Sequence, residues 1–364
     1  MKFARTPGFA ILMLLSLFVV LIFLWRIPCC KVQKPANDTL PVLSPKISNL
    51  AKEIALDNVL KSSGVGEAGM RTDQWERFET LTREASDTEL TALMKYPNAV
   101  VRCYAFQGMI LRGNTGVYQV LLRLLHDTAS VETFQGCIVS TTVAGDYCLN
   151  LVYPVVANSD TGTSGAFQQE HHILAKEQAI AIDSILLYDP SILLAAKYEL
   201  LYRMKPAPVF YHRVREIATN EGSPEAALAL ARFHKPADTA IIRRLFNREN
   251  TGYFAAYCAR EFPDESFYPL LVKMFEHEWA QKYYDYQKWR MLFQALARYP
   301  KPLTFQLFER TTQSADEFRY QTLGTYLMVA LTRYPDKLFE PLKDHLKFDQ
   351  SHQEELVEYL ETEK

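Results

Sequence analysis

The 364-residue chain has few cysteines and none of the short motifs that mark common catalytic sites. Six irregularly spaced cysteines are too few to hold a chain of this length together as a disulfide scaffold. It has no nucleophile elbow and no phosphate loop. Glu276-His277-Glu278 lacks the second histidine of a zincin helix, and the adjacent His171 and His172 would not converge on one metal. We therefore expect no enzyme activity, no catalytic residue, no metal site and no cofactor.

Most of the chain also lacks an excess of basic residues. Five of the 40 basic residues, and none of the 42 acidic ones, precede residue 35. The remainder carries 35 basic and 42 acidic side chains, which gives a formal charge of −7. Nucleic-acid binding depends on cationic contacts to phosphates, so we expect no nucleic-acid partner.

Only one stretch is long and apolar enough to cross a membrane. Residues 9–25 contain neither charge nor proline, and a helix of this length spans about 25 Å, close to the hydrocarbon thickness of a bilayer. Residues 26–29 lack the small side chains of a signal-peptidase site. We therefore expect an uncleaved transmembrane anchor within residues 1–30, with secretion after cleavage as the alternative. Residues 31–46, which contain three prolines, predict an extended linker.

The charges that flank the apolar stretch leave its orientation open, because basic residues stand on both sides. The arrangement resembles that of bacterial signal-anchored proteins. This resemblance implies a single-pass protein of the bacterial inner membrane whose C-terminal domain, residues 47–364, is exported.

The folded part begins with an amphipathic pattern that predicts a helix over residues 47–61. Gly64-Val65-Gly66-Glu67-Ala68-Gly69 follows and matches G-x-G-x-x-G. That motif binds dinucleotides between a strand and a helix of a βαβ unit. Because a helical pattern precedes it here, we interpret residues 64–69 as a flexible loop.

A proline-centred turn marks the boundary between two short helices. Tyr96 precedes Pro97, which ends a helix, and Asn98 is a good N-cap for the next one. Residues 86–89 form a capping box that starts the first helix. Val101, Ala105 and Met109 then line one face of the second helix. Two such helices cannot bury their apolar faces alone, so they must stack on neighbours.

Degenerate copies of this turn recur after residue 223. Their aromatic residues are spaced 29, 37 and 35 positions apart, and an arginine stands near the end of each preceding helix, where the helix dipole favours a cation. The copies are Arg232-Phe233-His234-Lys235-Pro236, Arg260-Glu261-Phe262-Pro263-Asp264, Arg298-Tyr299-Pro300-Lys301 and Arg333-Tyr334-Pro335-Asp336. The repeat resembles HEAT and armadillo-like α-solenoids. This resemblance implies an all-α fold of helical hairpins with an extended surface for a protein or peptide partner.

Two segments stand apart from the repeat. Residues 141–165 predict an irregular insertion, either a functional loop or a tolerated one. Cys137 precedes it and Cys148 lies within it, and whether these two cysteines pair is left open. Residues from 350 to the end predict a final amphipathic helix that caps the array.

The stretch with the most unusual composition is residues 279–293, which interleave aromatic and basic side chains typical of binding hot spots. On one helix, its residues at positions 279, 283, 286 and 290 would share a face. Alternatively, the rings fill a wide gap between helices. The candidate partner-binding residues are Trp279, Tyr283, Tyr286, Trp289 and Arg290, with Tyr253, Tyr257 and Arg260 nearby in the chain.

Together these patterns predict a membrane-anchored helical-repeat scaffold that binds a protein or peptide partner without catalysis. One alternative is a small-ligand or envelope-polymer binding protein, which would have a closed aromatic pocket. The other is an enzyme, which would bring carboxylate, histidine or hydroxyl groups together in one cleft.

Overall fold

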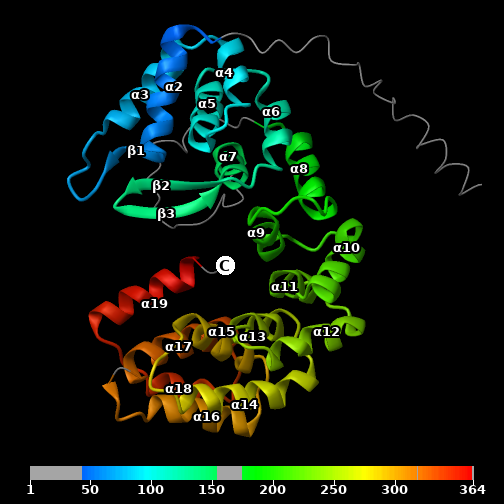
Figure 1. Ribbon diagram of the computed structural model, residues 1–364. Coiled ribbons are helices and arrows are strands. Elements are labelled where there is room, and N and C mark those ends of the chain that lie inside the picture. The colour runs from blue at the N-terminus through cyan, green and yellow to red at the C-terminus, as the bar shows by residue number, and fades with distance from the viewer. Residues whose placement is uncertain (1–42, 154–173, 318, 363–364) are drawn as a thin grey trace, which may run out of the picture. The chain divides into compact units, whose positions relative to one another are not determined.

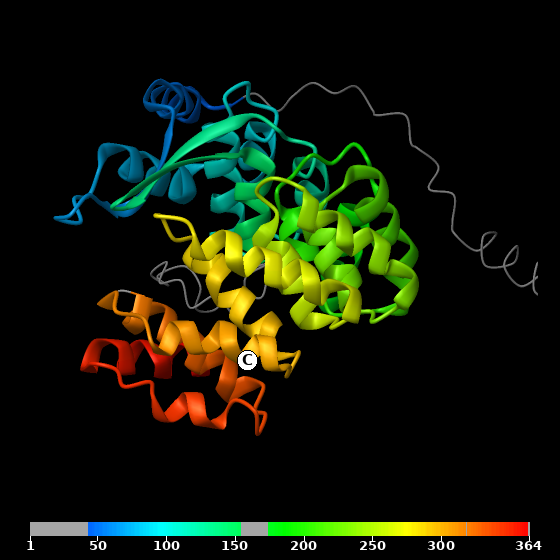
Figure 2. The same ribbon diagram turned by 90° about the horizontal axis from the view of Figure 1, so that it is seen from below.

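The computed structural model describes residues 43–153, 174–317 and 319–362 (Figure 1). The chain divides into residues 1–42 and a compact unit that begins at Leu43. In its described ranges this unit has 18 α-helices and one three-stranded sheet, so the mainly helical prediction is confirmed (Figure 2). No helix in these ranges is long and apolar enough to cross a membrane. The predicted anchor, residues 9–25, lies outside them.

The first helices pack around one enclosed helix, α5 (Ala99–Leu111). All residues of α5 from Ala99 to Ile110 except Arg102 are buried, not only the predicted face at every fourth position. The residues between these positions are also mostly apolar, so the helix is enclosed on every side. The helices around it are α2 (Pro45–Asp57), α3 (Asp73–Glu84), α4 (Asp87–Leu93), α6 (Val117–Leu124) and α7 (Ala144–Val152).

The predicted starts of α4 and α5 are confirmed. Asn98 caps α5 by accepting a hydrogen bond of 3.1 Å from the Val101 amide. Ser86 and Glu89 form the capping box of α4. The unit and its first helix begin within the range assigned to the linker, because Pro45 occupies the first turn of α2, where a proline loses no hydrogen bond.

A small sheet lies among the helices and was not predicted. It contains β1 (Val59–Val65), β2 (Ser130–Gly136) and β3 (Ile138–Val143), with β1 parallel to β2 and β2 antiparallel to β3. The predicted helix over residues 47–61 therefore ends early: Asn58, in the left-handed conformation with φ 57°, separates α2 from β1.

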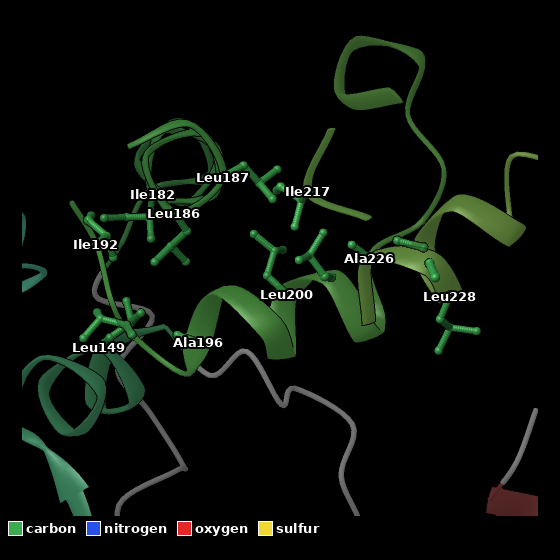
Figure 3. Close-up of a cluster of buried hydrophobic side chains, with 14 of the residues drawn as sticks. Leu149, Ile182, Leu186, Leu187, Ile192, Ala196, Leu200, Ile217, Ala226 and Leu228 are labelled. Atoms are coloured by element: carbon green, nitrogen blue, oxygen red, sulfur yellow. The ribbon is translucent and has the colours of Figure 1, made fainter. Parts of the chain in front are cut away.

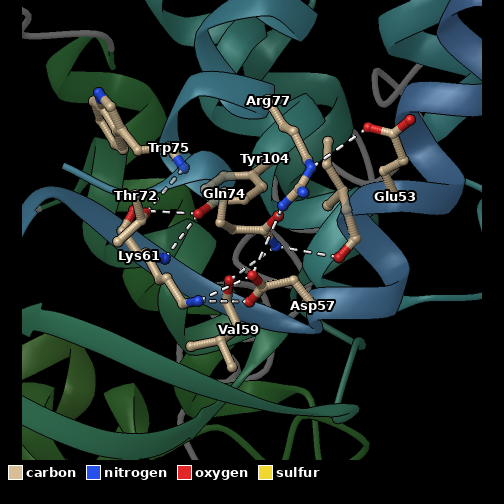
Figure 4. Close-up of polar contacts among 10 residues, drawn as sticks. Glu53, Asp57, Val59, Lys61, Thr72, Gln74, Trp75, Arg77 and Tyr104 are labelled. Atoms are coloured by element: carbon tan, nitrogen blue, oxygen red, sulfur yellow. Dashed lines mark hydrogen bonds and ion pairs between the residues drawn. The ribbon is translucent and has the colours of Figure 1, made fainter.

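Polar contacts join β1 to the helices around it (Figure 4). The Tyr104 hydroxyl on α5 accepts from the Lys61 amide at 2.7 Å and donates to the Lys61 carbonyl at 3.2 Å. Gln74 on α3 donates to the Ile54 and Val59 carbonyls, each at 3.1 Å. These long-range contacts hold a strand where the local sequence pattern favours a helix.

The glycine-rich segment is a tight turn at the end of β1, not a flexible loop that follows a helix. Val65 and Met70 exchange two backbone hydrogen bonds of 3.0 and 2.8 Å. Gly66 and Gly69 adopt positive φ angles of 73° and 59°, and their amides donate to the Gly136 and Gly66 carbonyls. Because both amides already have acceptors within the protein, they are not available to a phosphate.

Part of the predicted irregular insertion is regular. Residues 141–143 belong to β3 and residues 144–152 form α7, while residues 154–165 of the predicted insertion lie outside the described residues. β3 is rich in β-branched residues, which favour strands. Cys137 is exposed in the hairpin turn, whereas Cys148 is buried with its sulfur 3.9 Å from that of Cys103. Cys137 and Cys148 are therefore not paired.

From residue 174 onward, helices stack in chain order. α9 packs on α11, α11 on α13, α13 on α15, α15 on α17 and α17 on α19; we call these six the row helices. The helices between them pack along the row (Figure 1). The bounds are α8 (Lys176–Tyr188), α9 (Ala196–Arg203), α10 (Tyr211–Glu216), α11 (Pro224–Ala231), α12 (Thr239–Arg243), α13 (Gly252–Glu261), α14 (Tyr268–Trp279), α15 (Tyr286–Ala297), α16 (Pro302–Thr312), α17 (Gly324–Arg333), α18 (Glu340–Asp344) and α19 (Gln350–Thr362).

The four predicted turns fall at the ends of α11, α13, α15 and α17, as expected. One apolar core continues from α7 into the row helices. In Figure 3, Leu149 of α7, Leu186 of α8 and Leu200 of α9 belong to the same buried cluster. Burying one such side chain stabilises the fold by about 1.5–3 kcal/mol. Asp146 of α7 also accepts hydrogen bonds of 2.9 and 3.0 Å from the first amides of α9, at Ala195 and Ala196.

Candidate functional site

The predicted aromatic helix over residues 279–293 is two helices. α14 ends at Trp279 and α15 begins at Tyr286, after Asp285, which caps α15 by accepting from the Lys288 amide at 3.0 Å. The expectation of one shared helical face is therefore wrong. Tyr283 lies in the turn and is 90% exposed, whereas Trp289 is fully buried.

Four of the rings form a tryptophan cluster, which we define as Phe275, Trp279, Trp289 and Phe293. Phe275 stacks on Trp279 with centroids 5.6 Å apart, and Trp289 lies 5.1 Å from Phe275 and 5.3 Å from Phe293. These rings fill the space between α14 and α15, as the alternative interpretation expected. Trp289 is thus a core residue and is not placed to contact a partner.

The other candidate residues lie on the row helices. We call this second group the tyrosine–arginine network. Its members come from α9, α13, α15, α17 and α19, and all but Tyr326 are partly exposed. They are Tyr202, Tyr253, Tyr257, Arg260, Arg290, Tyr326 and Tyr359.

One end of the network is held by ring contacts and by an arginine. The hydroxyls of Tyr202 and Tyr253 are 2.7 Å apart, and the rings of Tyr202 and Tyr257 meet edge to face at 5.9 Å. The Arg260 guanidinium lies 4.1 Å from the centre of the Tyr257 ring, a cation–π distance. Arg260 also donates to Gln294 on α15 at 2.9 Å, which joins α13 to α15.

The other end joins α15 and α17 to the last helix. The Arg290 guanidinium of α15 lies 4.9 Å from the centre of the Tyr359 ring. Tyr326 of α17 meets the same ring at 5.6 Å. The Tyr359 hydroxyl donates to Glu355 at 2.8 Å, and Arg333 donates to the Tyr359 carbonyl at 3.0 Å. Because α15 carries both Gln294 and Arg290, the two ends meet on this helix, and together they draw on five helices.

The network combines neutral phenols with permanent cations. Burial raises the pKa of Tyr202, Tyr253 and Tyr326 above the ordinary tyrosine value, so these hydroxyls stay protonated at neutral pH. Burial by itself disfavours the charged form of Arg260, but Tyr257 and Glu261 outweigh it, and the pKa of Arg260 is raised. Such a surface offers hydroxyl donors, ring faces and guanidinium groups to a polar or anionic partner.

Two exposed tyrosines border the network. Tyr198 stands one helical turn before Tyr202 on α9, and Tyr286 stands one turn before Arg290 on α15. They are 42% and 49% exposed. Sequence reasoning missed Tyr198, Tyr202, Tyr326 and Tyr359. The repeated i, i+4 tyrosine pairs, at 198 and 202 and at 253 and 257, were the signal that could have identified part of this group.

A serine, a histidine and an aspartate meet after α8, but not as a catalytic triad. The Ser191 hydroxyl donates to Asp189 at 2.6 Å and lies 3.3 Å from His126 Nδ1, while His126 Nε2 is 4.0 Å from Asp189. In a triad the histidine stands between the other two and takes the serine proton. Here the serine bonds the aspartate directly, in a turn where the Ser191 amide also donates to Asp189.

Within the described ranges, no group of three or more His, Cys, Asp or Glu side chains is arranged to hold a metal ion.

Comparisons of the chain with protein-family models, with curated proteins and with solved structures return no match.

Proposed function

We propose that this protein is a membrane-anchored, HEAT-like helical-repeat scaffold that binds a protein or peptide partner and catalyses no reaction. The chain-order stacking of the row helices supports the repeat assignment, because helical hairpins in an α-solenoid contact mainly their neighbours. The apolar stretch at residues 9–25 supports the anchor. A protein of the bacterial inner membrane with an exported C-terminal domain fits both features.

The observation that carries the proposal is the continuity of the tyrosine–arginine network. Tyrosine and arginine are enriched among the residues that dominate binding energy at protein interfaces. Here they come from five helices and are fixed by contacts with one another, so little side-chain entropy is lost on binding. The exposed Tyr198 and Tyr286 extend this surface towards solvent.

The geometry favours this proposal over the two alternatives. A small ligand in the tryptophan cluster would have to separate rings that already contact each other at 5.1 to 5.6 Å. An enzyme would need reactive groups that converge in one cleft. In the Ser191–His126–Asp189 group the serine bonds the aspartate directly, whereas in a catalytic triad the histidine stands between them.

The test is affinity capture of the full-length protein from its native cells after crosslinking. We expect the native protein to capture a specific partner. The control variant Tyr283→Ala should still capture it, because the Tyr283 side chain lies in the exposed turn outside the network. Capture should be lost in a Tyr198→Ser/Tyr286→Ser variant, which removes exposed rings only. Circular dichroism checks that both variants are folded. Undiminished capture by the Tyr198→Ser/Tyr286→Ser variant would contradict the proposed surface.

A further inference from the structure

Two cysteines of the apolar core lie against each other. The sulfur atoms of Cys103 on α5 and Cys148 on α7 are 3.9 Å apart, and both side chains are fully buried. The other two cysteines of the described ranges differ: Cys137 is exposed in the β2–β3 turn, and Cys258 is buried on α13. The proposed function makes no use of the contact between Cys103 and Cys148.

The fold holds these two thiols side by side. α5 and α7 pack directly on each other (Figure 1). Tyr147, the neighbour of Cys148, donates a hydrogen bond of 3.1 Å to Gln107 of α5. Because Gln107 stands one helical turn after Cys103, this bond fixes the register of the two helices beside the thiol pair. The closeness of the sulfurs is therefore a consequence of how the two helices pack.

Only a small movement separates the two thiols from a disulfide bond. The sulfurs of a disulfide are about 2.05 Å apart, so the gap between Cys103 and Cys148 would have to close by about 1.9 Å. Each cysteine side chain can rotate between staggered positions about its Cα–Cβ bond. Rotation of the side chains can close a gap of this size while the helices stay in place.

Burial decides when such a bond can form. The thiolate, and not the thiol, is the form of cysteine that attacks a disulfide. Burial raises the pKa of the Cys148 thiol well above its ordinary value, so the folded core holds it as an unreactive thiol. We therefore expect the bond to form while the chain folds, before the core closes, and to be shielded from reductants afterwards.

We infer that Cys103 and Cys148 form an intramolecular disulfide bond in the native cell. This inference rests on the exported location in the proposed function, because disulfides form and persist in oxidising compartments. One cysteine thiolate attacks the disulfide of a thiol oxidoreductase, and the other then displaces the oxidoreductase from the mixed disulfide. The chain loses two protons and two electrons, and the oxidoreductase disulfide is reduced to two thiols.

The bond joins the enclosed helix of the first part to the helix that leads into the row. α5 lies at the centre of the first helices, whereas Asp146 of α7 accepts hydrogen bonds from the first amides of α9. The two cysteines are 45 positions apart, and the loop between them contains α6 and the β2–β3 hairpin. Closing a loop of this length restricts the unfolded chain and so stabilises the folded one.

The first test is the oxidation state of the full-length protein in its native cells. The cells are quenched with trichloroacetic acid, free thiols are blocked with N-ethylmaleimide in denaturant, and the digested protein is analysed by mass spectrometry. We expect a pair of peptides, linked through Cys103 and Cys148, that separates on reduction. Blocked thiols at both positions would overturn the inference, and so would a bond from either cysteine to Cys137.

Thermal unfolding of the full-length protein in detergent separates a covalent bond from mere packing of two thiols. Dithiothreitol should lower the melting temperature of the native chain by about 5–10 °C and should not change that of Cys103→Ala. Cys258→Ala is the matched control, because it truncates another fully buried cysteine and should respond to dithiothreitol as the native chain does. An equal response of the native chain and Cys103→Ala would contradict the bond.

Labelling of Cys137 distinguishes a failure of this inference from a failure of the proposed location. Because Cys137 is exposed, a membrane-impermeant maleimide should modify it in spheroplasts if the domain is exported. Free thiols at Cys103 and Cys148 together with a labelled Cys137 would contradict the disulfide alone. Free thiols together with a Cys137 that is labelled only after lysis would contradict both the disulfide and the export.

Discussion

At the scale of single residues, arginine side chains connect neighbouring hairpins. Arg232 donates to the Tyr202 carbonyl at 2.7 Å and to the Met204 carbonyl at 3.3 Å, at the end of α9. Arg102 donates to the carbonyls of Tyr96 and Pro97 within its own hairpin, at the end of the helix before it. Carbonyl oxygens at a helix end have no intrahelical donor, so an arginine from the next helix satisfies them. The recurring arginine thus does more than interact with the dipole of its own helix.

Arg232→Ala should lower the free energy of unfolding by about 1–3 kcal/mol, because it leaves two carbonyls without this charged donor. Arg298→Ala is the matched control: Arg298 is exposed and makes a cation–π contact of 5.1 Å with Tyr334, so about 0.5–1 kcal/mol is expected. Urea unfolding followed by circular dichroism measures both. Equal losses in the two variants would contradict the bridging role of Arg232.

Gly145 allows α7 to approach the end of α6. A Cβ atom there would lie 2.7 Å from the Leu124 carbonyl oxygen and 2.8 Å from a Leu194 methyl carbon. Gly145→Ala should therefore cost about 1–3 kcal/mol of stability. Gly252→Ala is the control, because a Cβ atom at position 252 would lie 3.1 Å from the flexible Lys288 side chain, which can move. Thermal unfolding should show little change in stability for this variant. A Gly145→Ala protein as stable as the native one would refute this close packing.

Trp289 and Tyr283 were both predicted to bind a partner, but they should respond differently to truncation. Trp289→Ala removes a fully buried ring and should cost about 3–5 kcal/mol. Tyr283→Ala changes a side chain that is 90% exposed and should stay within about 0.5 kcal/mol of the native stability. Trp289→Phe, which keeps a ring, should lose much less than Trp289→Ala. A small effect of Trp289→Ala in chemical denaturation would argue against the tryptophan cluster as core.

At the scale of elements, local sequence signals predicted the helix boundaries well. Asn98 and Ser86 each cap the helix that was expected to follow them. These signals depend on neighbours within four residues, so the sequence contains all the information they need. The proline-centred turns therefore predicted where four of the six row helices end.

Elements that depend on distant residues were missed. β1 pairs with β2, so that Val59 lies opposite Glu132, and Tyr104 supplies further bonds to the strand. Neither contact is visible in a local pattern. The break after Trp279 was also missed, and it moved Tyr283 and Trp289 apart. Tyr253, Tyr257, Arg260 and Arg290 do lie together, but their neighbours on α9, α17 and α19 depend on how the helices stack.

Glu89, at the start of α4, should make the stability of the protein depend on pH in the acid range. Hydrogen bonds from the Ser86 amide, followed by those from Ser44, lower the pKa of Glu89 from 4.5 to about 2. A carboxylate with a depressed pKa contributes stability above its unfolded-state pKa and loses that contribution as the pH falls through its folded pKa. The contribution of Glu89 should therefore decline between about pH 4.5 and 2.

Glu89→Gln removes this titration. We expect the melting temperature of the native chain to fall more steeply than that of Glu89→Gln as the pH is lowered through this window, and the two curves to run parallel at higher pH. Differential scanning calorimetry at closely spaced pH values gives the comparison. Identical slopes throughout the acid range would show that these bonds do not persist in solution.

At the scale of the whole molecule, the described unit joins a sheet-containing group of helices to a row of stacked hairpins through one continuous core. In such a stack each hairpin is stabilised mainly by its neighbours. Side chains from helices distant in the sequence then line up, as Tyr202 of α9 and Tyr359 of α19 do at the two ends of one network. We propose that this aligned surface, and no single residue, performs the function.

Site-specific photocrosslinking in native membranes tests that claim most directly. A photoreactive phenylalanine analogue is placed at Tyr198, Tyr286 or Tyr283, all of them large and exposed side chains. We predict that positions 198 and 286, on α9 and α15, crosslink to the same partner protein and that position 283 does not. If position 283 alone forms crosslinks, or if positions 198 and 286 form none while the protein is folded and in the membrane, the tyrosine–arginine network is not the binding surface.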